Sequence, residues 1–122
     1  MRRIIFTALV LIALAQIARA ADAPLLTEAR QALAESIPQV AVQKLRTLLA
    51  TPGLTPAERA AAQRELGAAF FAAGQNDEAL AAVQALADAG DAAAHLLRAQ
   101  VLARMGRWAD ALALFQIGRA HV

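Results

Sequence analysis

Hydrophobic residues recur along this chain in short stripes, and each stripe stops at a residue that ends helices. One stripe comprises Leu66, Ala69, Phe70 and Ala73. Apolar residues that recur every three or four positions lie on one face of an α-helix. The pattern therefore predicts a series of amphipathic helices.

Proline and glycine mark where these helices begin and end. Residues 51–53 (Thr-Pro-Gly) end one helix, and residues 55–58 (Thr-Pro-Ala-Glu) form a capping box with proline at the first helical position. Gly74, Gly90 and Gly106 fit the left-handed conformation that closes a helix. These signals predict helices over Pro24–Glu35, Pro38–Ala50, Pro56–Ala73, Asp77–Ala89, Asp91–Met105 and from Trp108 onward, with Asn76 or Asp77 capping the fourth.

The loops between these helices are short, so neighbouring helices are expected to run antiparallel. A lone pair of helices cannot bury both of its stripes, and the pairs must therefore stack. The composition agrees, because Ala, Leu, Gln, Glu and Arg dominate the region and favour helix over sheet. We expect an all-α fold of antiparallel helical hairpins.

The chain also repeats itself. Four positions recur 32 residues later: Gly74, Ala79, Leu80 and Val83 return as Gly106, Ala111, Leu112 and Phe115. A period in the thirties is typical of stacked helical hairpins.

The order of small and large residues resembles tetratricopeptide repeats. One unit has Leu66-Gly67 and Phe70 in its first helix, Gly74 at the turn, and Ala79 with Val83 in its second; the next has Ala99, Leu102, Gly106, Trp108, Ala111 and Phe115. The resemblance implies a right-handed α-solenoid, with units at residues 56–89 and 90–116, the latter truncated. Residues 21–55 would be a divergent first hairpin or a cap. The 32-residue period, against the family's usual 34, and Leu86, where the family prefers alanine, leave a related repeat class open.

Both ends of the chain are expected to lie outside this fold. Residues 1–20 combine two arginines, an apolar run and Ala18-Arg19-Ala20, as in a signal peptide cleaved after Ala20. The run is short for a membrane anchor, so we expect a periplasmic or secreted protein that meets a membrane only if this segment is retained. Residues 117–122 resemble a translated sequencing adapter, which predicts a non-native tail and a natural protein that continues at position 116.

Removing these ends reverses the charge balance. The chain has 12 Lys and Arg against 10 Asp and Glu. Four of the arginines, Arg2, Arg3, Arg19 and Arg119, lie in the end segments, which leaves eight basic residues against ten acidic ones. The slightly acidic remainder gives no sign of a nucleic-acid surface. Cysteine is absent, so helix packing must supply the stability.

Little in the sequence suggests catalysis. Ser36 is the only serine, and His95 is the only histidine outside the tail, so neither a catalytic triad nor a metal cluster can be assembled. We expect no enzyme activity, no cofactor and no small-molecule substrate. His95 is interpreted as a surface or satisfied core residue, Glu58 as the capping partner of Thr55 rather than half of a carboxylate pair with Glu65, and Trp108 as core.

The resemblance does imply a binding surface. First helices line the concave groove of such solenoids, which places Arg64, Ala68, Phe71, Gln100 and Arg104 in it. If Phe70 is buried, Phe71 points about 100° away, and an exposed Phe71 beside Arg64 and Arg104 would suit a partner with an apolar anchor and acidic groups. The alternative is that Phe71 meets the preceding hairpin and both arginines are solvated.

The favoured function is therefore a periplasmic scaffold that binds a protein or peptide, without nucleic acid or cofactor. A second hypothesis is an accessory repeat region of a longer envelope enzyme, such as a protease or wall hydrolase, whose catalytic domain is missing. A third is an oligomerisation element.

Overall fold

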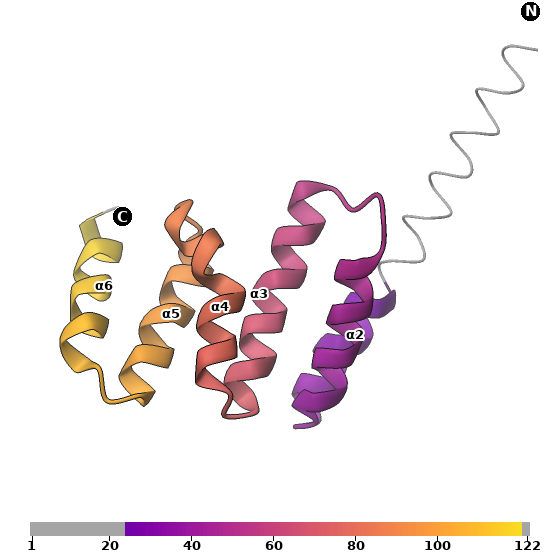
Figure 1. Ribbon diagram of the computed structural model, residues 1–122, viewed down its shortest axis with the longest axis horizontal. Coiled ribbons are helices and arrows are strands. Elements are labelled where there is room, and N and C mark those ends of the chain that lie inside the picture. Colours follow the sequence, from indigo (N-terminus) through magenta and orange to yellow (C-terminus); the bar gives the residue numbers. More distant parts are fainter. Residues whose placement is uncertain (1–23, 121–122) are drawn as a thin grey trace, which may run out of the picture.

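The computed structural model describes residues 24–120, with side chains as far as residue 116. Every regular element in this range is an α-helix, as Figure 1 shows. The helices are residues 24–34, α2 (Pro38–Ala50), α3 (Pro56–Ala72), α4 (Asn76–Asp88), α5 (Ala92–Arg104) and α6 (Trp108–Ala120). The all-α prediction is confirmed, and the predicted helix boundaries from residue 34 onward differ from these by at most one residue.

Two helices begin at a side chain that caps them. The Glu58 N–H donates to Thr55 Oγ1 over 3.2 Å at the start of α3, as the capping box predicts. The Ala94 N–H donates to Asp91 Oδ1 over 2.9 Å at the start of α5. Each bond satisfies a backbone donor that the helix itself leaves unpaired.

The prediction that Asn76 or Asp77 caps α4 is wrong. The helix begins at Asn76, and the preceding residue, Gln75, makes no side-chain capping bond. The turn before α4 is only three residues long, which leaves Gln75 at the cap position. Asp77 lies instead in the first turn, where its charge interacts favourably with the helix dipole.

The turns before α4, α5 and α6 share one geometry. Gly74, Gly90 and Gly106 have φ angles of 77°, 95° and 79°. In each turn, the residue after the glycine donates its N–H to the carbonyl five residues earlier, which is a Schellman cap. Ser36, with a φ of 61°, takes the glycine's place after residues 24–34. The chain therefore reverses direction tightly and repeatedly.

Each of the helices α2 to α6 packs against its neighbours in sequence, so they form a row from α2 to α6 in Figure 1. In addition, α3 contacts α5 directly. Gly67 on α3 permits this close packing, because a side chain there would meet Val83 of α4 and Leu97 of α5. Three helices thus converge on one glycine.

The two predicted end segments are described only in part. Residues 1–20, the predicted signal peptide, lie outside the described residues. Of the predicted tail, residues 117–120 continue α6 and the last two residues lie outside. Among the helices of residues 24–120, none combines the length and apolar character that a membrane span requires.

Candidate functional site

The surface predicted to bind a partner lies on α3 and α5, the first helices of the hairpins α3–α4 and α5–α6. We call it the first-helix face. It contains a shallow hollow of about 240 Å³ between the two helices. The lining residues are Arg64, Glu65 and Ala68 from α3 and Ala93, Ala94 and Leu97 from α5. Most of the lining is therefore small and apolar, and its two charged residues, Arg64 and Glu65, both come from α3.

The structure separates the five predicted groove residues into two groups. Arg64 and Ala68 line the hollow. Phe71 and Arg104 contact each other beyond it, and Gln100 is exposed on α5 without lining it. The predicted residues thus lie on the two expected helices but do not form one continuous site.

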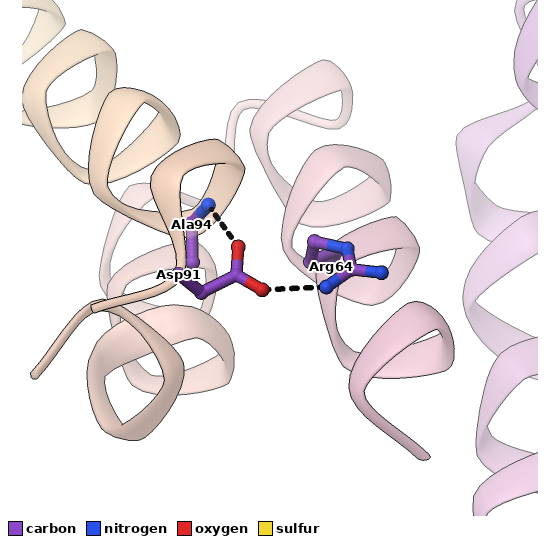
Figure 2. Close-up of polar contacts among 3 residues, drawn as sticks. All are labelled: Arg64, Asp91 and Ala94. Carbon is purple, nitrogen blue, oxygen red and sulfur yellow. Dashed lines mark hydrogen bonds and ion pairs between the residues drawn. The ribbon is translucent and has the colours of Figure 1, made fainter. Parts of the chain in front are cut away.

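Arg64 is held by an ion pair across the two first helices. Its Nη1 donates to Asp91 Oδ2 over 2.5 Å, while Asp91 Oδ1 caps α5 through the Ala94 N–H, as Figure 2 shows. The Ala94 N–H lowers the pKa of Asp91 most strongly, and the Arg64 guanidinium lowers it further against the opposing effect of burial. One carboxylate therefore both starts α5 and ties it to α3.

Phe71 is half-buried, which corrects the expectation that it is exposed. Its ring packs against the main hydrophobic core, and the Arg104 guanidinium lies 3.4 Å from the ring centroid. Arg104 Nη1 also donates to the Phe71 carbonyl. Neither arginine is simply solvated, because each is paired within the chain. The Phe71 carbonyl also accepts from the Gly74 N–H over 3.1 Å, and the dipole of α3 favours a cation at this end of the helix.

A second ion pair, which the sequence pattern does not predict, borders the same face. Arg30 Nε donates to Glu65 Oε1 over 3.0 Å and joins the helix of residues 24–34 to α3. The two residues are 35 positions apart, so no local spacing signals the contact. With the Arg64–Asp91 pair, it links three consecutive first helices along one side.

His95 and Trp108 differ in how far the fold covers them. His95 is half-buried, with Nε2 at 2.7 Å from the Leu114 carbonyl, so it is satisfied as predicted. The prediction that Trp108 is core is wrong, since Trp108 is 69% exposed. Trp108 begins α6, the last described helix, and no described helix covers its outer side.

Glu58 and Glu65 do not form a carboxylate pair. The Glu58 backbone is capped by Thr55, whereas the Glu65 side chain pairs with Arg30. Residues 24–116 hold no group of three or more His, Asp or Glu side chains placed to bind a metal.

The chain matches no protein-family model, no curated protein and no solved structure. Its function therefore has to be argued from its own surface.

Proposed function

We propose that this chain is an exported scaffold of tetratricopeptide-like hairpins, stacked as a right-handed solenoid, that binds a peptide or protein on the first-helix face. Two packing features support the solenoid. The direct contact of α3 with α5 brings first helices together, and Ala79 and Ala111 are equally buried, at 0% and 2% exposure, 32 residues apart. The N-terminal pattern of residues 1–20 supports export.

The observation that carries the binding proposal is the hollow between α3 and α5. Its floor consists of alanines and Leu97, so a partner's backbone can approach closely. Its rim charges are already balanced, because Arg64 pairs with Asp91 and Glu65 with Arg30. Apolar contact should therefore contribute most of the affinity, and the rim charges should mainly set orientation.

A peptide-selection experiment tests this proposal. Peptides selected from a random library on the immobilised chain would be labelled, and their affinities measured by fluorescence anisotropy. Ala68→Trp fills the hollow and should weaken binding by tenfold or more, as expected when a buried anchor is lost. The matched control is Ala85→Trp, at an exposed position of α4 outside the hollow. Equal binding by both variants would rule out this face.

A second candidate function is self-association through α6. Trp108, Leu112 and Phe115 are all exposed on this helix, the latter two at 57% and 41%. Exposed apolar groups of this size commonly mark interaction surfaces. Sedimentation velocity should show concentration-dependent association that Leu112→Glu removes and Ala85→Glu does not.

A further inference from the structure

A larger hollow lies elsewhere on the molecule, between α4, α5 and α6. Its volume is about 460 Å³. Leu80, Leu102 and Leu114 provide apolar walls, and Gln84, Arg98 and Arg107 provide polar ones. We call it the second groove. Arg98 and Leu102 lie five residues after Ala93 and Leu97, about 140° around α5, so the second groove is on a different side of that helix from the first-helix face.

The chain contains an equivalent place that is filled. Ala41 and Leu45 of α2 are fully buried, as are Ala79 and Val83 of α4 at the same four-residue spacing. This alignment pairs Arg46 of α2 with Gln84 of α4. The 32-residue repeat likewise pairs Phe70 of α3 with Leu102 of α5.

At the filled place, an aromatic ring and a cation occupy the surface between α2 and α3. Phe70 is buried, and the Arg46 guanidinium lies 5.5 Å from its ring centroid. At the second groove, both counterparts are shorter, because leucine replaces the ring and glutamine replaces the guanidinium. The alignment therefore places the hollow beside Leu102, the counterpart of Phe70, with Leu80 and Leu114 as further apolar lining.

The polar wall adds an unpaired hydrogen-bond donor. Arg98 pairs through Nη1 with Asp88 over 2.8 Å, but its Nε is buried without a hydrogen-bond partner. Arg107 pairs with Asp110, which also lines the hollow. Each guanidinium is therefore already paired with a carboxylate, but the Arg98 Nε–H remains as a donor from which a carboxylate of a ligand can accept.

We propose that the second groove binds an aromatic side chain of a partner polypeptide, with an adjacent carboxylate of that partner accepting a hydrogen bond from Arg98. The ring would occupy the space that Phe70 fills one hairpin earlier. This site is independent of the first-helix face, so either can fail without the other.

N-acetylphenylalanine is the smallest probe that carries both groups. Titrated into the ¹⁵N-labelled full chain, it should shift the backbone amide signals of Leu80, Leu102 and Leu114 most. N-acetylalanine, which lacks the ring, should give no such shifts. N-acetylphenylalanine amide, which lacks the carboxylate, should bind several-fold more weakly. Shifts centred on Ala93 and Leu97, or on Trp108, would overturn the proposal.

A variant that fills the groove from within completes the test. Gln84→Arg with Leu102→Phe reproduces the residues of the filled place and should weaken probe binding by about tenfold, the loss typical of a blocked anchor site. Ala113→Trp, at an exposed lining position, blocks the groove without altering a buried residue and should act likewise. Ala85→Trp is the control. Undiminished binding by Ala113→Trp would overturn the proposal even if the double variant fails to fold.

Discussion

The hairpin α3–α4 and the hairpin α5–α6 carry matching residues 32 positions apart, but their matching positions are covered to different extents. Val83 is fully buried, whereas its counterpart Phe115 is 41% exposed. Val83 packs with Ala94 and Leu97 of α5. No described helix packs beyond α6 to do the same for Phe115. Burial at a repeat position thus depends on the next hairpin more than on the residue itself.

Residues that face their own hairpin partner behave differently. Ala79 and Ala111 are both buried, although α6 has no described helix beyond it and packs only against α5. The comparison therefore separates two kinds of core position. At one kind, the side chain is buried within its own hairpin. At the other kind, the side chain is buried only when the next hairpin packs against it.

The largest expected effect on stability is at Val83, which we compare with its counterpart Phe115. Val83→Ala should lower the free energy of unfolding by about 2 kcal/mol, the usual cost of a cavity left by buried methyl groups. Phe115→Ala removes more carbon atoms but from a half-exposed ring, so it should cost less than about 1 kcal/mol. Urea denaturation followed by circular dichroism measures both. A larger cost at Phe115 would mean that its position is covered as fully as that of Val83.

The next effect concerns Gly67, where three helices meet. Gly67→Ala should cost about 1 kcal/mol net, because crowding against Val83 and Leu97 outweighs the gain in helix propensity. Ala61→Gly, at a half-exposed interior position of the same helix, measures mainly the propensity contribution. Adding Val83→Ala to Gly67→Ala removes one crowded neighbour and should reduce the cost of the Gly67 substitution. If Gly67→Ala is stabilising, the close approach is not limiting.

The helix boundaries could be predicted because local residues determine them. Gly74, Gly90 and Gly106 adopt the left-handed conformation that the sequence pattern requires, and Thr55 caps α3 through its own side chain. The error at Asn76 has a local cause too, since the turn length, rather than cap preference, determines which residue precedes the helix.

The candidate sites were less predictable because distant residues complete them. Arg64 and Arg104 lie on α3 and α5, but periodicity does not indicate that Asp91 and the Phe71 carbonyl bind their guanidiniums. The second groove depends on aligning Arg46 with Gln84, and the irregular link between α2 and α3 hides that alignment in the sequence. Trp108 was misassigned because the sequence pattern does not show that no described helix packs over it.

A third, smaller effect on stability concerns Asp91. Its carboxylate caps α5 through the Ala94 N–H and pairs with Arg64 of α3. Asp91→Ala removes the cap of α5 and should cost about 1 kcal/mol, whereas Arg64→Ala removes only a partly exposed ion pair and should cost less than about 1 kcal/mol. Thermal melts of the two variants measure the difference. Equal costs would mean that the ion pair, rather than the cap, accounts for the stabilisation.

The same residue predicts a pH dependence. The folded state lowers the pKa of Asp91, chiefly through the Ala94 N–H, so it binds the proton less tightly than the unfolded chain. This stabilisation is present above the unfolded pKa, near 3.8, and is lost as the pH falls through the lower folded value. The stability gap between the wild type and Asp91→Asn should therefore be largest near neutral pH and narrow below about pH 4. A gap that widens in acid would reverse the assigned sign.

The smallest effect distinguishes a paired from an unpaired residue on the first-helix face. Arg104 covers the Phe71 ring and binds its carbonyl at the end of α3, so Arg104→Ala should cost roughly 0.5 to 1 kcal/mol. Gln100 is exposed one turn earlier, and Gln100→Ala should change stability by less than about 0.5 kcal/mol. Arg104→Lys keeps the charge but not the planar group, and it should fall between the two. If the three variants melt together, Arg104 does not hold α5 against α3 and is available to a partner on this face.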